Sequence, residues 1–215
     1  MSEAESPGGH AVSRFLLVAA IAGVLFGGSA VPAPRPKDEP VPPDYYPAAV
    51  GTVWVYDMNN GNGEQVRRVS AVEDKDGAKV VTLEERGATR WIPAERAAVS
   101  PSGVRLIEFA GHTVEPYVSL KYPVRAGDTW DFDMPPQVGL TGYSGTVTVL
   151  GEEVVEVPAG KFKAVKVERI LKTEDGKPLA KPTKITVWFA EGVGRVKVSN
   201  SAGCELALKS FTRGR

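Results

Sequence analysis

From Val50 onward, apolar and polar residues alternate with a period of two, and clusters of Gly, Asn, Asp and Pro interrupt the alternation. No long stretch carries an apolar stripe with the 3.6-residue period of an amphipathic helix. A period of two is the pattern of a strand that buries one face. The sequence therefore predicts an all-β fold.

The C-terminal half predicts sequential strands joined by tight turns. The Asp175-Gly176 pair favours a hairpin, because both positions tolerate the left-handed geometry of such a turn. In the later strand at 195–199, Val196 and Val198 are expected to point inward. The expected strands cover residues 146–157, 162–171, 184–189, 195–199 and 204–208. Strands joined in this way form an antiparallel meander, so we expect curled sheets in a partial barrel or a sandwich.

An internal repeat relates residues 46–56 to residues 122–132. Both segments have the form Y-P-x3-G-x2-W-x-[YF], at a constant offset of 76. The residue pattern places Trp54, and likewise Trp130, on one strand face with the aromatic residue two positions later. We expect both tryptophans to be core anchors. The single domain, 44–215, would then contain two related halves, about 46–121 and 122–215.

The N-terminus has the pattern of an export signal. Phe15–Phe26 reads FLLVAAIAGVLF, follows Arg14 and precedes small residues. This pattern predicts a signal peptide over residues 1–30, cleaved after Ala30, with Ala33 as the second choice. The alternative is an uncleaved membrane anchor, although a span needs about 20 apolar residues.

Residues 31–43, VPAPRPKDEPVPP, form a proline-rich segment that predicts an extended linker. No cysteine directly follows the apolar run, which excludes lipid attachment there. We expect the chain to be exported to the periplasm, the cell envelope or the medium. The membrane would be a partner only through the N-terminal segment, if that segment is retained.

The net charge of the chain does not point to a binding partner. The 26 basic and 26 acidic residues balance, so the chain has no electrostatic footprint for nucleic acid. The lone cysteine, Cys204, rules out an internal disulfide. Other partners are not indicated by the sequence.

Nucleophilic catalysis has few candidate residues. Gly142-Tyr143-Ser144-Gly145-Thr146 approaches the G-x-S-x-G motif, but Thr146 breaks it and no strand-to-helix context surrounds it. His112 is the only histidine beyond the predicted signal peptide, so any histidine-based catalysis would have to use it. Cys204 could be a nucleophile, but Leu206 and Leu208 beside it favour a buried core position.

Acidic residues could form a calcium site or a paired-carboxylate site, but the sequence pattern favours neither. Asp128, Asp131 and Asp133 could bind calcium, but the last two simply alternate with aromatic residues, as on a solvated strand face. The members of Glu84-Glu85 and of Glu152-Glu153 are expected to point to opposite faces. No catalytic, metal-binding or cofactor-binding residue is assigned, and no cofactor is expected.

The tryptophans have two interpretations. They could line a sugar or lipid pocket, but filling the core is the favoured role. The four are Trp54, Trp91, Trp130 and Trp188.

Three ordered motifs resemble a family of exported bacterial proteins. YYPAAVGTVWVY near residue 45, VPAGKFKAVKV at 157–167 and WFAEGVGRVK at 188–197 are similar to the signatures of an uncharacterised domain-of-unknown-function and TapB-like set. The resemblance spans roughly residues 45–211. It implies an antiparallel sheet curled into a partial barrel in the cell envelope, and it supplies no reaction.

The sequence thus favours an uncharacterised exported β domain with a binding or structural role, and not an enzyme. Two alternatives stay open. One is a carrier that holds an apolar ligand in a curled-sheet pocket. The other is an enzyme with an unrecognised carboxylate site.

Overall fold

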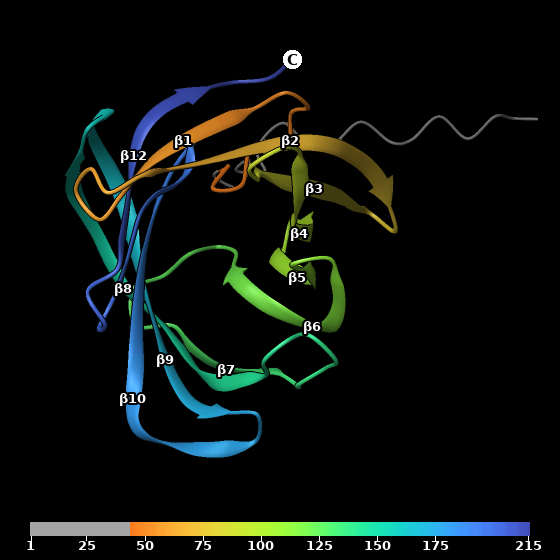
Figure 1. Ribbon diagram of the computed structural model, residues 1–215, viewed down its shortest axis with the longest axis vertical. Helices are drawn as coiled ribbons and strands as arrows, with labels where there is room; N and C mark the ends of the chain where they lie inside the picture. Colours follow the sequence, from red (N-terminus) through yellow and green to blue (C-terminus); the bar gives the residue numbers. More distant parts are fainter. Residues whose placement is uncertain (1–43) are drawn as a thin grey trace, which may run out of the picture. The chain divides into compact units, whose positions relative to one another are not determined.

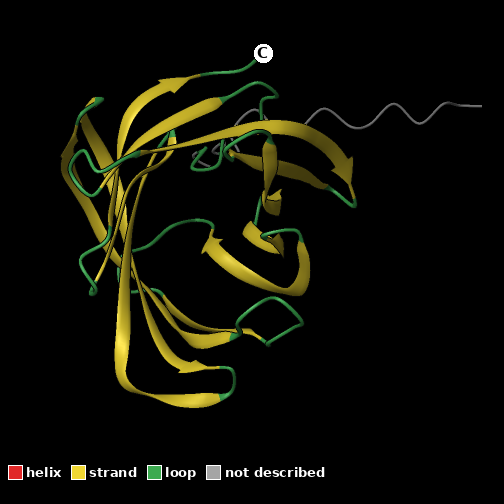
Figure 2. Cartoon of the chain, viewed as in Figure 1, coloured by secondary structure: helices red, strands yellow, loops and turns green. Residues whose placement is uncertain are grey.

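The computed structural model describes residues 44–215, and every regular element in that part of the chain is a β-strand (Figures 1 and 2). The prediction of an all-β fold is confirmed. The strands are β1 (Val53–Met58), β2 (Glu64–Lys75), β3 (Ala78–Arg86), β4 (Trp91–Ser100), β5 (Gly103–Phe109), β6 (His112–Lys121), β7 (Thr129–Met134), β8 (Tyr143–Val157), β9 (Gly160–Glu174), β10 (Lys177–Ala190), β11 (Gly194–Asn200) and β12 (Glu205–Thr212).

All twelve strands belong to one antiparallel sheet in the order β6-β5-β4-β3-β2-β1-β12-β11-β10-β9-β8-β7. Strands that follow each other in the sequence pair with each other, with the single exception of β6 and β7. In addition, the first strand, β1, pairs with the last strand, β12. The sheet curls into a nearly closed barrel shape (Figure 1). Of the two architectures expected for the meander, the partial barrel is therefore correct and the sandwich is wrong.

The two edge strands, β6 and β7, meet along a line that we call the seam. No strand pairing joins them, and side chains make the contact instead. Trp130 Nε1 of β7 donates a 2.9 Å hydrogen bond to the carbonyl of Val118 in β6. The rings of Tyr117 and Phe132 lie 5.5 Å apart across the same line. The barrel is thus closed at the β1–β12 joint by a strand ladder and at the seam by side chains.

The tight turns have the geometry that the sequence predicts. Asp175 and Gly176 have φ values of 49° and 74°, and they connect β9 to β10. Asp76 and Gly77, between β2 and β3, have φ values of 51° and 75°. Positive φ at both central positions gives the turn whose twist matches the flanking strands.

The two repeated segments share the same glycine turn, although the Tyr122-Pro123 peptide bond is cis and the Tyr46-Pro47 bond is not. Gly51 N donates to Val69 O at 3.0 Å, and Gly127 N donates to Val149 O at 2.8 Å. The two glycines have φ values of 83° and 87°, which favour glycine over other residues. Each loop leads into the first strand of a six-stranded run. One of these strands, β1, lies at the closed joint, whereas the other, β7, lies at the seam.

The core contains three of the four tryptophans. Trp54, Trp130 and Trp188 are 5%, 8% and 8% exposed, so the core interpretation is confirmed for them. It is wrong for Trp91, which is only partly buried at the start of β4. The guanidinium of Arg68 lies 4.2 Å from its ring centroid, so a cation–π contact covers this ring in place of core packing.

The prediction of a buried core position for Cys204 is also wrong. Cys204 is exposed and lies in the turn before β12, which begins only at Glu205. Its amide donates to Asn200 Oδ1 at 3.0 Å. The side chain of Asn200 therefore organises the turn, and β12 begins one residue later than the apolar pattern suggested.

The predicted signal peptide, its cleavage after Ala30 and the linker 31–43 lie outside the described residues. Within residues 44–215, no helix has the length and apolar character needed to span a membrane.

Candidate functional site

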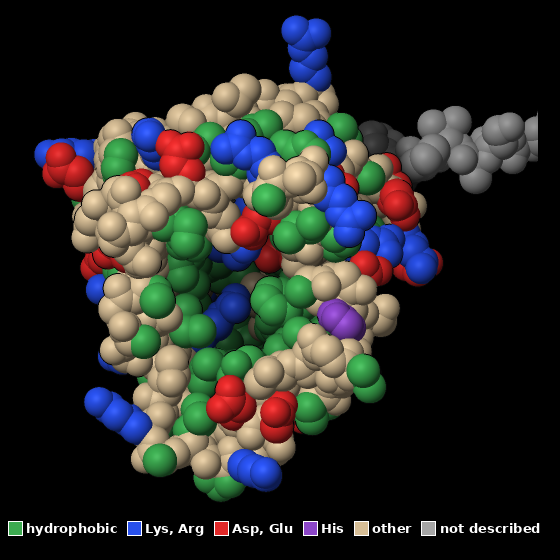
Figure 3. Space-filling model, in the orientation of Figure 1, with side chains coloured by type: hydrophobic (Ala, Val, Ile, Leu, Met, Phe, Trp, Pro, Cys, Tyr) green, Lys and Arg blue, Asp and Glu red, His purple; other side chains and the backbone are tan. Residues whose placement is uncertain are grey.

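The inward face of the curled sheet encloses a space that we call the lumen. In the space-filling view the molecule is hollowed on one face, where hydrophobic side chains surround basic ones at depth (Figure 3). An apolar lumen would be the simple consequence of inward-facing Val and Leu residues. The basic residues show that this lumen also carries buried charge.

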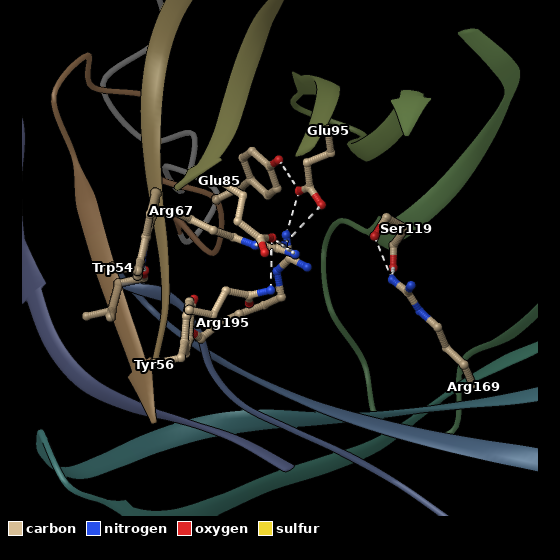
Figure 4. Close-up of polar contacts among 11 residues, drawn as sticks. Trp54, Tyr56, Arg67, Glu85, Glu95, Ser119, Arg169 and Arg195 are labelled. Atoms are coloured by element: carbon tan, nitrogen blue, oxygen red, sulfur yellow. Dashed lines mark hydrogen bonds and ion pairs between the residues drawn. The ribbon is translucent and has the colours of Figure 1, made fainter. Parts of the chain in front are cut away.

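Glu95 of β4 lies at the centre of a buried polar cluster (Figure 4). Its Oε1 accepts hydrogen bonds from Tyr46 Oη and from Arg195 Nη2, each at 2.5 Å. Its Oε2 lies 3.8 Å from Arg67 Nη1. Because Glu95 is only 7% exposed, these neighbours replace the water that would otherwise solvate the carboxylate.

The cluster fixes the protonation states of its members. Burial by itself would raise the pKa of Glu95, but the two arginines and the tyrosine hydroxyl outweigh it and lower that pKa from 4.5 to about 2. Burial, and then the charge of Glu95, raise the pKa of Tyr46 well above its usual value. For Arg195, burial would lower the pKa, and the neighbouring Glu95 charge raises it instead. At neutral pH the cluster is therefore an ionised, fully engaged ion pair.

Arg67 extends the cluster toward the β1–β12 joint. Its Nη2 lies 3.2 Å from Glu85 Oε2, and Gln65 Nε2 donates to the same oxygen at 2.9 Å. Trp54 and Arg67 are directly opposite each other in the β1–β2 pair, so they share the inward face. Each of these two lumenal arginines, Arg67 and Arg195, thus has a carboxylate partner.

β-Bulges explain how the ion pair reaches the lumen. In the β10–β11 pair the register shifts after Trp188, so that Arg195 lies opposite Phe189. Residues directly opposite each other share a face, and this places Arg195 inward. Val196 is fully buried as the alternation predicts, yet the bulge turns its charged neighbour inward as well. A similar shift after Leu83 in the β3–β4 pair accompanies Glu95.

A cavity of about 80 Å³ lies in the lumen between the walls of the barrel. Its polar lining comes from Tyr46, Glu95, Ser119, Arg169 and Arg195. Its apolar lining includes Ala97, Val104, Leu106, Val187 and Phe189, and Tyr117 contributes both an aromatic ring and a hydroxyl. By the measure in which one water needs about 10–15 Å³, the cavity has room for roughly five waters.

Arg169 contributes the cavity's second cation and lies apart from the cluster around Glu95 (Figure 4). Its Nη2 donates to Ser119 Oγ at 2.7 Å and approaches the Ser119 carbonyl at 3.5 Å. Its Nε is buried and has no hydrogen-bond partner in residues 44–215. A buried donor without a partner is unusual in a folded protein and calls for an explanation.

The three aspartates considered for calcium do not form a site. Asp131 and Asp133 are exposed and alternate with buried residues of β7, which confirms the prediction of a solvated face. Asp131 Oδ1 accepts from Thr146 Oγ1 at 2.8 Å and lies 3.7 Å from Lys172 Nζ. Within residues 44–215, no three His, Cys, Asp or Glu side chains gather as a metal would require.

The candidate nucleophiles are not assembled with a base. Ser144 Oγ hydrogen-bonds to Thr173 Oγ1 on the neighbouring strand β9. His112 begins β6 after the β5–β6 turn, and Cys204 lies in the β11–β12 turn. None of the three lines the lumenal cavity.

The Glu84-Glu85 pair divides between the two faces of the sheet, as its adjacency predicts. Glu85 faces inward with Arg67, whereas Glu84 lies 2.8 Å from Arg68 Nη2. Glu152 and Glu153 pair with lysines, Lys163 at 2.7 Å and Lys166 at 3.3 Å. The carboxylate at the centre of the polar cluster is instead Glu95, which the sequence analysis did not single out.

The sequence carries one signal that points to the lumenal residues. Val165, Val167, Arg169 and Leu171 alternate along β9, so an arginine stands where the pattern calls for an apolar side chain. The structure confirms that Arg169 lies opposite Val147 and Ile185 on the inward face. No comparable signal marks Arg195, because its inward direction depends on a bulge.

These features define an exclusively β-stranded, barrel-shaped domain with a polar lumenal site. Two solved structures share the fold. One is a candidate exported protein with a YmcC-like fold from Bacteroides fragilis, with a TM-score of 0.54 and 14% identity over 78% of this chain and 98% of that one. The other is a candidate lipoprotein from Parabacteroides distasonis, with a TM-score of 0.56 and 14% identity over 80% of this chain and all of that one.

At this identity the likeness concerns the fold alone. No protein-family model and no curated protein matches the sequence. The curled antiparallel sheet expected from the motif resemblance agrees with both solved structures, whereas the TapB-like family name stays a resemblance.

Proposed function

We propose that this protein is an exported, non-enzymatic binding domain that holds a small organic ligand in the lumen of its barrel. The observation that carries the proposal is the cavity of about 80 Å³, which is lined by both apolar and hydrogen-bonding groups. Such a mixed lining is typical of small-molecule sites, where apolar contacts give affinity and a few polar groups fix orientation.

Export is supported by the apolar run Phe15–Phe26, with Arg14 before it and small residues after it. The two proteins that share the fold are a candidate exported protein and a candidate lipoprotein, which agrees with a role in the cell envelope. Cleavage after Ala30 remains part of this proposal.

A carboxylate-based enzyme is disfavoured by the state of Glu95. It is the only acidic side chain of the described residues that lines the cavity. Its pKa of about 2 keeps it ionised, and a general acid or base works best when its pKa lies near the working pH. The purely apolar carrier is also disfavoured, because Arg169 and Arg195 line the same cavity.

A cavity-filling variant tests the proposal. Ala97 is fully buried and lines the cavity, so Ala97→Leu should occupy the space that a ligand would use. Ala202→Leu, in the exposed β11–β12 turn, makes the same chemical change away from the lumen. Both variants are first compared with the wild type by circular dichroism and thermal unfolding.

The probes are six-carbon compounds, namely hexanol, hexanamide and hexanoate, and binding is followed by amide chemical shifts. We expect at least one probe to shift lumenal resonances such as those of Leu106, Val187 and Phe189 in the wild type and in Ala202→Leu. The same probe should leave folded Ala97→Leu unchanged. A wild-type protein that responds to none of the probes would instead support a purely structural role.

A further inference from the structure

Arg169 is a cation placed where the strand pattern calls for an apolar residue. It lies opposite Val147 of β8 and Ile185 of β10, between the inward residues Val167 and Leu171 of its own strand. Arg169 as a whole is half-buried, and its Nε is fully buried. Burial of an unpaired charge is costly, so a charge retained there needs a compensating partner.

That partner is absent from the described residues. No carboxylate of residues 44–215 lies within 4.0 Å of Arg169, although Arg67 and Arg195 each have one. The hydrogen bond to Ser119 Oγ engages Nη2 and leaves the buried Nε without an acceptor. A guanidinium presents its N–H groups as a fork that matches the two oxygens of a carboxylate.

Tyr117 supplies a second donor to the same cavity. Its ring packs against Phe132 at 5.5 Å, and its side chain lines the cavity together with Arg169. Burial raises the pKa of Tyr117, while the nearby charge of Arg169 acts in the opposite direction. The hydroxyl therefore stays protonated at neutral pH and keeps its hydrogen to donate.

The charges that line the cavity do not cancel. Glu95 contributes one negative charge, whereas Arg169 and Arg195 contribute two positive charges. The surplus is a single positive charge, located on the arginine that has no acidic partner. A monoanion would neutralise the cavity, and a dianion would reverse its sign.

We propose that Arg169 and Tyr117 bind the carboxylate of a small amphiphilic monoacid, whose apolar portion lies against Leu106, Val187 and Phe189. This assignment rests on the proposed lumenal binding function and specifies the class of ligand. The volume of about 80 Å³ suits a short acyl or comparable organic acid and not a long lipid chain. Ser119 holds the guanidinium in place from the β6 side of the seam.

The test compares hexanoate with hexanamide, a neutral compound of nearly the same shape, using the purified full-length chain and isothermal titration calorimetry. We expect hexanoate to bind at least tenfold more tightly than hexanamide. Hexyl phosphate is the third probe. If it binds more tightly than hexanoate, or if the amide binds as well as the acid, the carboxylate assignment is overturned.

Variants locate the contact. Arg169→Gln should weaken hexanoate binding at least tenfold and abolish the preference for acid over amide, whereas Tyr117→Phe should weaken it several-fold. Arg105→Gln is the matched control, because Arg105 is exposed on β5 between the inward residues Val104 and Leu106. Its binding should equal that of the wild type.

Different results would contradict the proposed binding function and the assignment of Arg169 to a carboxylate. If Arg169→Gln folds and still prefers hexanoate as the wild type does, this assignment is wrong, but binding in the lumen stands. If no probe binds the wild type at all, both the binding function and the carboxylate assignment are wrong. The comparison of acid with amide needs only the wild type, so it tests the carboxylate assignment even if a variant does not fold.

Discussion

Arg195 and Glu95, a hundred positions apart in the sequence, form a 2.5 Å hydrogen-bonded ion pair inside the barrel. Arg195 belongs to β11 and Glu95 to β4, which are not neighbours in the sheet. The pair therefore links two walls of the barrel that no strand ladder connects. Tyr46, which precedes the first strand, joins the same carboxylate oxygen and ties the N-terminal approach to the lumen.

Glu95→Gln should destabilise the protein strongly. Removal of one partner from a buried ion pair leaves the other charge uncompensated, at a cost of about 3–5 kcal/mol. Urea unfolding followed by circular dichroism measures the change in the free energy of unfolding. Glu156→Gln is the control, because its 3.5 Å pair with Lys161 is exposed and should contribute less than about 1 kcal/mol. Equal stabilities of the two variants would contradict the bracing role of Glu95.

Acid should weaken the fold through the same carboxylate. The pKa of Glu95 is about 2 in the folded protein and near 4.5 without its partners. A lowered pKa contributes stability that is fully present above the unfolded value and is lost as the pH falls toward the folded value. The loss corresponds to about 3 kcal/mol, since one pKa unit equals about 1.4 kcal/mol.

The measurement is the difference in unfolding free energy between the wild type and Glu95→Gln, taken from about pH 6 down to pH 2. We expect this difference to shrink across that window, because protonated Glu95 comes to resemble glutamine. Other carboxylates titrate in both proteins and largely cancel. A difference that stays constant would mean that Glu95 is not held ionised in the fold.

Arg169 and Arg195 should respond differently to the same substitution. Arg195→Met removes the cation closest to Glu95, so it should lower the free energy of unfolding by about 3–5 kcal/mol. Arg169→Met leaves no carboxylate unpaired and relieves the burial of a lone charge, so its free energy of unfolding should stay within about 1 kcal/mol of the wild type. Thermal and urea unfolding of the two variants provide the comparison. A large loss in Arg169→Met would assign this residue a structural role across the seam.

More of the fold than of the candidate site could be predicted from the sequence. Period-two alternation and Asp-Gly turns are local signals, and they predict the strands and the hairpins because both depend on neighbouring residues. Arg169 is also visible locally, as a charge among the inward residues Val167 and Leu171. An arginine at an apolar position of a strand indicates a group inside the barrel.

The Glu95–Arg195 pair could not be predicted in the same way. Its formation depends on the pairing of β1 with β12, which brings the two six-stranded runs into one barrel, and on a bulge that turns Arg195 inward. A bulge adds one residue to one strand and breaks the alternation, so it has no period-two signature. Cys204 was misplaced for a related reason, since the side chain of Asn200 sets where the last turn ends.

The corrected position of Cys204 has a direct test. An exposed thiol in a turn should react with Ellman's reagent in the native protein as fast as it does after unfolding in denaturant, within a few-fold. A buried thiol would react only on unfolding. Cys204→Ser should abolish the reaction without changing the midpoint of thermal unfolding. Protection of the thiol in the native state would restore the core position that the sequence suggested.

The repeat gives the last prediction, because it places equivalent tryptophans at two unequal closures of the barrel. Trp54 lies in β1, which a full ladder joins to β12, and its Nε1 donates to Val193 O at 2.7 Å. Trp130 lies in β7 at the seam, and its Nε1 donates to Val118 O of β6. Phenylalanine keeps an aromatic ring at each position but removes the donor, which costs about 1 kcal/mol.

Native-state hydrogen exchange distinguishes the two sites. Trp130→Phe should speed exchange of the β6 amides near Val118 roughly five-fold, since no strand ladder supports the seam and opening there can be local. Trp54→Phe should leave exchange in β12 unchanged, because the ladder with β1 persists without the indole hydrogen bond. Equal effects at both strands would mean that the seam is as firmly closed as the joint. A seam that opens locally, in contrast, would give a small ligand a path to the cavity beside Arg169 without unfolding of the barrel.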